Sequence, residues 1–198
     1  MSLKRGRGVS RQHPSHVPRQ VGFTLVELMV TVALAAMLMA MAYPSFTSLT
    51  NNSRLTAAAN EFVSAIQLAR TEAIRLNRRV AVCPGDAAGT ACQDDGDWAR
   101  WLTVVVDTGQ VLRSGDVRAP IEVRVSPNIE GNPNGIVFRP DGYARLPNGL
   151  LLQATISPCL PTDRPPANVR NVRIDGGSRV NVEAVDAAGA CEAPGDAP

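Results

Sequence analysis

The side chains that could carry chemistry are few and unevenly placed along the chain. Both histidines, His13 and His16, lie in a basic segment at the start. One glutamate, Glu27, lies inside an otherwise apolar run. All the cysteines lie beyond position 80, at Cys83, Cys92, Cys159 and Cys191. The candidates are therefore disulfide or metal chemistry in the later part of the chain and an unusual carboxylate near its start.

An even number of cysteines in an oxidising compartment favours disulfides. Three pairings are possible, and Cys83–Cys92 with Cys159–Cys191 is favoured because each pair closes a local loop. The alternative is a zinc site. No pair has the close C-x-x-C spacing of zinc ribbons, and both histidines lie in the leader.

We expect no enzyme and no cofactor. Without histidine beyond the leader, neither a Ser–His nor a Cys–His nucleophilic site can form. The acidic cluster Asp94-Asp95-Gly96-Asp97 lacks the spacing and the closing glutamate of an EF-hand loop. A solvated loop explains it better than a calcium site does.

A membrane segment must position Glu27. Residues 23–43 read FTLVELMVTVALAAMLMAMAY, with Glu27 as the one charged residue. As a helix this segment is about 31 Å long, which matches the hydrocarbon core of a bilayer. A basic flank precedes it, and that flank keeps the start of the chain in the cytoplasm and sends the rest across the membrane.

The charges of the leader hide the character of the rest. The whole chain has 20 basic and 18 acidic residues. Five basic residues lie in the first 22, so 15 basic and 18 acidic residues follow, a net charge of −3. The formal charge of +2 therefore says little about the working protein.

The junction before the apolar run resembles the signal of type IV pilins. Its residues are Gly22-Phe23-Thr24-Leu25-Val26-Glu27-Leu28, with the basic leader ending at Gly22. The resemblance implies that a prepilin peptidase cuts between Gly22 and Phe23, methylates the Phe23 amine and leaves the apolar helix on the protein. The alternative is an uncleaved signal anchor.

Glu27 supports this reading physically. A carboxylate in an apolar membrane helix costs on the order of 2–3 kcal/mol near the centre and less near the end. In pilins the equivalent glutamate is thought to pair with the new amine of a neighbouring subunit during assembly, which assigns that role to Glu27 by resemblance. The alternative is a glutamate at the membrane end that reaches water.

A second periodic stretch, expected to be the amphipathic half of the same long helix, and a β-rich region follow. Pro44 is expected to bend or interrupt the first helix. Apolar residues then recur at helical spacing up to about Arg78 and form one stripe: Leu55, Ala58, Ala59, Phe62, Ile66, Ala69, Ala73 and Leu76. Short β-like runs are expected at 80–83, 101–106, 111–113, 121–125, 136–139, 150–156, 169–174 and 179–185.

These features resemble the GspH/FimT family of minor pilins and pseudopilins. The residues that carry the resemblance are Ala69–Ile74, Arg79–Pro84, Gly96-Asp97-Trp98 with Trp101, and Ile136–Gly142. The resemblance implies an α+β, type IV pilin-like fold, with one long N-terminal helix packed on antiparallel β-sheets. The expected parts are a cleaved leader at 1–22, a transmembrane helix at 23–50, a periplasmic head at 51–191 (helix 51–78, β-rich 79–191) and a disordered tail at 192–198.

The C-terminal segment carries arginines with few acids. Some FimT-like minor pilins bind DNA during natural transformation through a Gly-Arg-x-Arg motif, which residues 168–173 and 177–181 match loosely. The possible DNA-binding residues are Arg164, Arg170, Arg173 and Arg179. Phosphate contacts by arginine weaken steeply with salt. The alternative is that these charges are simply solvated.

Two readings of the whole protein remain open. The first is a minor pilin near the tip of a type IV pilus, held in the inner membrane with its head in the periplasm and then assembled into the fibre. The second is a minor pseudopilin of type II secretion. The expected partners are prepilin peptidase, other major and minor pilins, the assembly platform, membrane lipid before assembly and, as a further hypothesis, double-stranded DNA.

Overall fold

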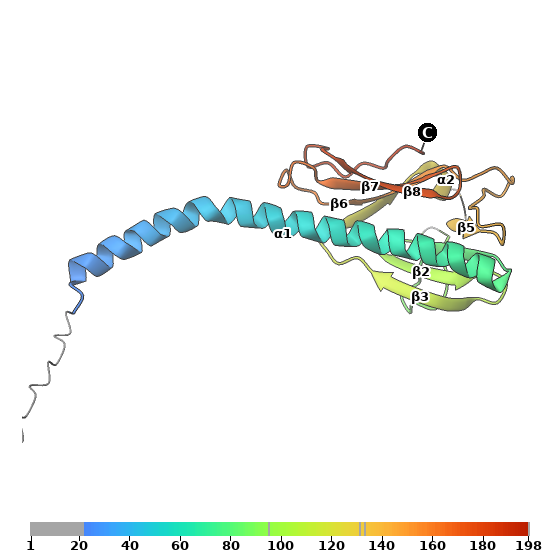
Figure 1. Ribbon diagram of the computed structural model, residues 1–198, viewed down its shortest axis with the longest axis horizontal. Coiled ribbons are helices and arrows are strands. Elements are labelled where there is room, and N and C mark those ends of the chain that lie inside the picture. The colour runs from blue at the N-terminus through green and yellow to red at the C-terminus, as the bar shows by residue number, and fades with distance from the viewer. Residues whose placement is uncertain (1–21, 95, 131, 133, 198) are drawn as a thin grey trace, which may run out of the picture. The chain divides into compact units, whose positions relative to one another are not determined.

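A computed structural model describes residues 22–94, 96–130, 132 and 134–197, with the side chains of 41–44 left out. The leader residues 1–21 therefore lie outside the described residues. The chain forms two compact units, Met1–Ala42 and Tyr43–Pro198. We call residues 23–42 the stem and the second unit the head unit, and each is described by itself. Helix α1, Leu25–Leu76, contributes to both (Figure 1).

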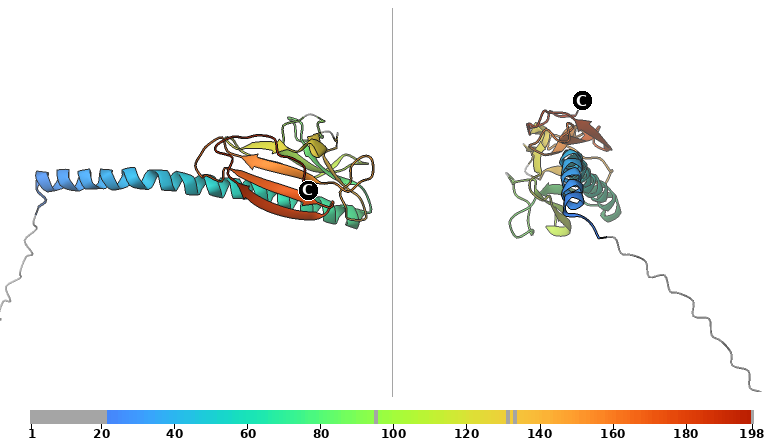
Figure 2. Two further views of the ribbon diagram at one scale, coloured as in Figure 1. Left: turned by 90° about the horizontal axis from the view of Figure 1, so that it is seen from above. Right: turned by 90° about the vertical axis from the view of Figure 1, so that its left-hand side faces the viewer.

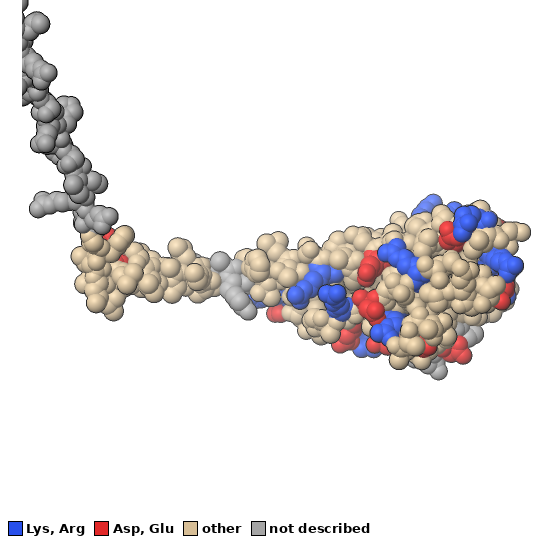
Figure 3. All heavy atoms as spheres, turned by 90° about the horizontal axis from the view of Figure 1, so that it is seen from below, with Lys and Arg blue, Asp and Glu red and all other residues tan. Residues whose placement is uncertain are grey.

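The stem is helical and apolar on all sides. It holds the one described helix segment that is long and apolar enough to cross a membrane, with a mean hydropathy of 2.2 over its best window and no residue of that window buried. Figure 3 shows this part of the surface as almost entirely uncharged. A helix that is apolar on all sides is stable only where every side is removed from water. The stem is therefore consistent with a lipid or helix-bundle environment.

Of the bend or interruption expected at Pro44, no interruption occurs, and α1 is the one long helix that the resemblance implies, from Leu25 to Leu76. A proline removes one helical hydrogen bond, and the turns on either side can hold the helix together. The helix ends at Leu76, and Asn77 after it has a φ of 52°. Arg78 N donates to Ala73 O at 3.2 Å and Asn77 N to Ile74 O at 3.3 Å, the Schellman arrangement.

In the described residues, eight strands form two antiparallel sheets. The first has the order β3-β2-β1-β5 and the second β4-β6-β7-β8. The strands are β1 Val80–Pro84, β2 Arg100–Val105, β3 Gln110–Asp116, β4 Glu122–Val125, β5 Ile136–Phe138, β6 Ala154–Cys159, β7 Val169–Asp175 and β8 Arg179–Val185. The expected α+β class with antiparallel sheets is confirmed.

Three elements differ from the expectation. Strand β3 extends to Asp116, three residues beyond its expected end. Strand β6 begins at Ala154, four residues later than expected, and runs through Pro158 to Cys159. Pairing with β7 is present at Ala154–Ile156 and again at Cys159, so Pro158 lies where that ladder is broken, although it still lies opposite Val123 of β4. The break expected between Asn128 and Gly135 starts with a one-turn helix, α2 (Pro127–Glu130). Gly131 and Pro133 lie outside the described residues.

The core of the head unit lies between α1 and the two sheets (Figures 1 and 2). The predicted apolar stripe of α1 is buried from Leu55 to Ala73, and Leu76 at its end is half-buried. Phe62 lies 6.1 Å from Trp101 of β2, centroid to centroid. Alanine occupies most of the other stripe positions, so the larger side chains make up most of the apolar volume of the stripe.

A second apolar cluster lies on the other face of the first sheet. Its buried members are Ala81, Cys83, Leu102 and Val104. Half-buried Cys92, across the disulfide from Cys83, packs against this cluster. Both faces of the first sheet are thus apolar, which explains why β1 and β2 read as continuous apolar runs rather than alternating ones.

Gly115 makes room for the largest core residue. A Cβ at this position of β3 would lie 2.3 Å from Trp101 Cζ2, and Trp101 is fully buried.

We expect Gly115→Ala to destabilise the full-length protein in detergent by about 1–3 kcal/mol through overpacking. Thermal melting followed by near-ultraviolet circular dichroism measures this. The control is Ser114→Ala on the same strand, whose side chain is exposed, and equal melting temperatures for the two variants would contradict the packing described.

Candidate functional site

The first candidate site is the start of α1. Gly22 and Phe23 precede the helix, and Phe23 is 79% exposed. Thr24 caps the helix, because its Oγ1 accepts a hydrogen bond from Glu27 N at 3.2 Å and its carbonyl accepts one from Leu28 N at 3.1 Å. A threonine cap followed three residues later by glutamate is the capping-box pattern. A peptide bond just outside a capped helix is accessible to an enzyme.

Glu27 lies in the first turn of α1 and its side chain is exposed. The free N–H groups of this turn carry partial positive charge, which stabilises a carboxylate there. Large apolar side chains surround it on the helix, among them Leu25, Leu28 and Met29, each more than half exposed. The sequence predicted the cost of this carboxylate in lipid, and its place in the first turn of the helix identifies part of what offsets that cost.

Both favoured disulfides are present. Cys83–Cys92 closes a loop from β1, and Cys159–Cys191 ties the C-terminal segment to β6. Asp86 organises the first loop, since its carboxylate accepts hydrogen bonds from Thr90 N at 2.6 Å and Thr90 Oγ1 at 2.9 Å. Hydrogen bonds from the backbone N–H groups of Thr90 and Ala91 hold the pKa of Asp86 below its usual range.

Asn168 supports the second disulfide. Its side chain is fully buried and donates from Nδ2 to Leu160 O at 2.9 Å and to Ala190 O at 3.0 Å, and its Oδ1 accepts from Ala187 N at 2.9 Å. One amide thus satisfies three backbone groups from two distant segments. Composition alone did not reveal this residue.

Residues beyond Cys191 are not detached from the head unit. Asp196 Oδ1 accepts a hydrogen bond from Asn128 N at 3.0 Å, and Ala197 is 5% exposed. Residues 192–197 form no helix or strand, but they lie against the region of α2, where composition predicted a disordered tail. The reason is specific contact by Asp196 and Ala197, which a composition rule cannot detect.

The structure does not bring the four candidate arginines together. Arg170 and Arg173 lie on opposite faces of β7, because they are three residues apart on one strand. Arg173 NH1 pairs with Glu183 Oε2 at 3.2 Å. Arg179 lies on β8, opposite Asp175 of β7, and its side chain is exposed. Arg164 is exposed in the loop before β7.

Arg170 is a structural residue. It is 8% exposed and donates to the carbonyls of Ala167 and Val169 at 2.8 and 2.9 Å, and also to Asn52 Oδ1 of α1. Burial lowers the pKa of this guanidinium from a value far above neutrality, so the charge remains. Arg170 therefore fastens β7 to α1.

Two members of the acidic cluster line a hollow. Asp94 and Asp97 face a space of about 420 Å³ together with Trp98, Ile129 and Glu130, while Asp95 lies outside the described residues. Among the residues that the structure describes, no three acidic, cysteine or histidine side chains are grouped as metal ligands.

Comparison with known families identifies the chain. The family model described as type II transport protein GspH matches residues 58–178, which is more than half of the chain. The chain belongs to the GspH family. A second model, the prokaryotic N-terminal methylation motif, matches residues 18–43 and so includes Gly22, Phe23 and Glu27. The GspH/FimT resemblance noted in the sequence is confirmed, and GspH-family proteins are structural subunits of the pilin and pseudopilin type.

Solved structures similar to this GspH-family chain include two minor pilins or pseudopilins. The minor pilin FimU of Pseudomonas aeruginosa is 20% identical, with 68% of this chain and 92% of that chain covered and a TM-score of 0.47. The minor pseudopilin EpsH of the Vibrio cholerae type 2 secretion system is 16% identical, with 66% and 97% covered and a TM-score of 0.46. No match was found among curated proteins.

The buried position of Arg170 predicts how it differs from the exposed Arg179. We expect Arg170→Ala to destabilise the full-length protein by about 1–3 kcal/mol, because it leaves buried acceptors unpaired. Arg179→Ala should stay within about 0.5 kcal/mol, as surface substitutions do. Chemical denaturation in detergent measures both. An Arg170→Ala protein as stable as Arg179→Ala would show that the β7–α1 contact contributes nothing.

Proposed function

We propose that this protein is a minor pilin of a type IV pilus, made as a precursor, trimmed between Gly22 and Phe23, and assembled through its stem. The observation that supports this most is the start of α1. An exposed glycine–phenylalanine junction lies just outside a capped helix whose following turns are apolar on every side. Cleavage there would leave the membrane segment on the mature protein rather than remove it.

The physics of the helix start suggests what trimming achieves. A new α-amino group at Phe23 is a positive charge next to the helix N-terminus, where positive charge is unfavourable. Glu27 in the first turn supplies the opposite charge, either within the subunit or to a neighbour. In lipid or in a bundle of stems these charges are poorly solvated, so subunits that pair them across an interface are favoured over unpaired ones.

Stem packing would drive the rest of the assembly. The large apolar side chains of the stem, which include Val30, Val32 and Leu34, are 53–79% exposed. In lipid they are surrounded by hydrocarbon, and in a filament they pack against other stems, where close van der Waals contact replaces lipid. The platform and ATPase that lift subunits from the membrane are expected partners of this step.

A minor pseudopilin of type II secretion is the second candidate, and the matching family model is described by that transport system. Deletion of the gene in its own organism discriminates between the two. A minor pilin predicts loss of surface fibres with normal protein export, and a pseudopilin predicts the opposite. The tip position is part of the first proposal and is tested by immunogold labelling of sheared fibres.

DNA binding is a weaker extension of this proposal. Arg170 is buried and Arg173 is paired, so Arg164 and Arg179 are the two candidates that remain exposed without a carboxylate partner among the described residues. A fluorescent duplex that binds at low salt and is released by Arg179→Ala would support it. Binding that is indifferent to both Arg164 and Arg179 would remove it.

One prediction of this proposal concerns the mature N-terminus. Co-expression with a prepilin peptidase should give a protein that begins at Phe23 and carries one methyl group on the Phe23 amine. Intact-mass and N-terminal peptide mass spectrometry measure both. Gly22→Val should block the cut because it adds bulk at the scissile bond. Native protein that retains residues 1–22, or that lacks the stem, contradicts the proposal.

Another prediction of this proposal concerns the role of Glu27 in assembly. We expect Glu27→Ala to be cleaved normally but to be absent from sheared filaments, since the charge that pairs with the Phe23 amine is lost. Quantitative immunoblotting of the membrane and filament fractions measures this. The matched control is Thr31→Ala, one turn further along the same helix. Incorporation of Glu27→Ala at the wild-type level would exclude the assembly role.

A further inference from the structure

The start of the head unit carries two arginines that the fold does not neutralise. Arg54 lies on α1 and Arg118 lies in the loop between β3 and β4, and both side chains are exposed. Both line one hollow of about 520 Å³. Neither has a carboxylate partner within the part of the chain that the structure describes. We call these two residues the arginine pair, and Figure 3 shows basic side chains grouped over this start of the head unit.

The carboxylates of the same hollow leave the arginine pair charged. Asp116 lines the hollow, but it pairs with Arg100 at 2.7 Å. Glu61 also lines it, from seven residues further along α1 than Arg54, which is about 10 Å. Two like charges on one surface repel each other, and an anion bound between them relieves that repulsion. The arginine pair therefore favours a ligand with negative charge.

Backbone contacts fix the position of Arg118. Ile121 N donates to Arg118 O at 3.2 Å, and Val117 N donates to Ala99 O at 2.6 Å. Val117 and Ile121 are each 8% exposed, so both ends of this short loop are anchored in the core. Arg54 is part of a long helix. The arginine pair is thus preformed, and a ligand does not have to order it.

Chain connectivity keeps Arg54 close to the end of the apolar run. That run ends at residue 43, and Arg54 follows eleven residues later in the same helix. Eleven helical residues span about 16 Å, and a bend would only shorten this path. The headgroup layer of a bilayer extends about 5–8 Å beyond its hydrocarbon core. The remaining gap of about 8–11 Å is close to the Debye length at physiological ionic strength, and helical side chains point back toward the N-terminus, which closes part of it.

The residues in between suit the headgroup layer. Positions 44–50 read PSFTSLT, with four hydroxyl side chains and no charge. Phe46 and Leu49 are 71% and 68% exposed, and apolar side chains of this size are stable at the boundary of headgroups and acyl chains. Arg54 is the first charged residue after Glu27. The sequence therefore changes from apolar to uncharged polar to basic in the order in which a bilayer changes from core to headgroup to water.

We propose that the arginine pair binds the headgroups of anionic phospholipids, of the phosphatidylglycerol type, on the periplasmic face of the inner membrane. A guanidinium donates two hydrogen bonds to one phosphate, and the contact is charge-assisted. It would hold the head against the membrane until assembly lifts the subunit out. The inference rests on the part of the proposed function that places the stem across the membrane and the head in the periplasm.

Lipid fits the arginine pair better than nucleic acid does. Non-specific binding of a DNA duplex depends on many phosphate contacts at once, and two arginines supply few. A membrane presents its headgroups at high local concentration to a protein that is already anchored in it, so two contacts are enough to shift the position of the head.

A fluorescent label beside the arginine pair tests the contact. Full-length Ala119→Cys protein carries a bimane label and is reconstituted into vesicles of phosphatidylcholine, alone or mixed with phosphatidylglycerol. A nitroxide on some phosphatidylcholine headgroups quenches a label that touches the headgroup layer. Ala119 is exposed next to Arg118, and the four native cysteines are in disulfides. We expect phosphatidylglycerol to increase the quenching and high salt to abolish the increase.

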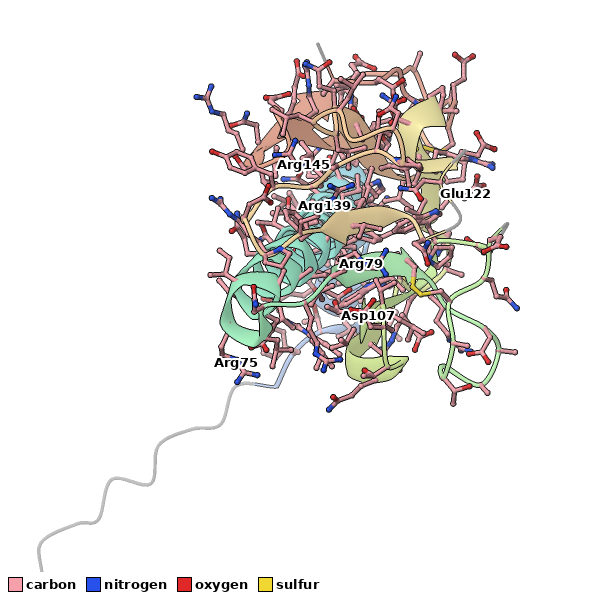
Figure 4. The ribbon with its side chains drawn as sticks, turned by 90° about the vertical axis from the view of Figure 1, so that its right-hand side faces the viewer. Arg75, Arg79, Asp107, Glu122, Arg139 and Arg145 are labelled. Carbon is pink, nitrogen blue, oxygen red and sulfur yellow. A yellow bond between two sulfur atoms is a disulfide. The ribbon has the colours of Figure 1, made fainter. Side chains whose placement is uncertain are left out.

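Charge variants make the test specific to the arginine pair. Arg54→Gln with Arg118→Gln should remove the increase, because each arginine shifts the equilibrium between docked and free heads about fivefold. Lysine at both positions should retain it, since the charge is kept. The matched control is Arg78→Gln with Arg139→Gln, which removes equal charge at the other end of the head unit, where Figure 4 shows Arg139 near Arg145. A melting curve checks the folding of each variant.

Flotation of the vesicles separates the two levels of the proposal. Protein that does not float with the vesicles lacks a membrane stem, which contradicts the proposed function itself. Protein that floats, but whose quenching ignores phosphatidylglycerol or is equal in the arginine-pair variant and the control, overturns the headgroup contact alone. Binding of a short fluorescent DNA duplex that depends on Arg54 and Arg118, without lipid-dependent quenching, overturns it in favour of nucleic acid.

Discussion

Everything in this protein depends on where one helix is apolar. Over the stem, α1 is apolar on all sides and exposes large side chains without a protein core to cover them. From Leu55 to Ala73 the same helix is apolar on one stripe, and that stripe is buried by two sheets. The change from an all-round to a one-sided pattern within a single helix allows one element to serve as a membrane segment and as the support of a β-rich domain.

The β-rich part depends on that stripe in turn. The first sheet packs Trp101 against Phe62, and Gly115 leaves the space for the indole. The second sheet is fastened by polar groups as well as by apolar packing, through Arg170 to Asn52 and through Asn168 to the segment before Cys191. These buried polar groups are satisfied by backbone carbonyls, and a satisfied polar contact specifies one arrangement of helix and sheet more narrowly than apolar packing does.

The sequence predicted the periodic parts of the structure and missed the parts that depend on single contacts. The α1 stripe and the existence of all eight strands follow from local patterning, which physics reads directly. The favoured cysteine pairs follow from loop length. The predicted start of β6 was wrong because Leu150 and Leu151 have the residue types of a strand, but both side chains are exposed in a loop that folds back on itself. The contacts of Asp196 with Asn128 and of Arg170 with Asn52 join specific atoms, and no pattern of residue types encodes them.

The arginines show why charge is hard to interpret from sequence. All 15 basic residues after the leader are arginine, so composition alone cannot separate a nucleic-acid surface from structural charge. Arg170 donates to carbonyls and an amide oxygen, Arg173 and Arg145 pair with carboxylates, and Arg113 lies 5.7 Å from the Trp101 ring centroid. These are uses of a planar, multiply donating cation that lysine serves poorly. An arginine whose donors are already occupied within the fold has little left for a phosphate.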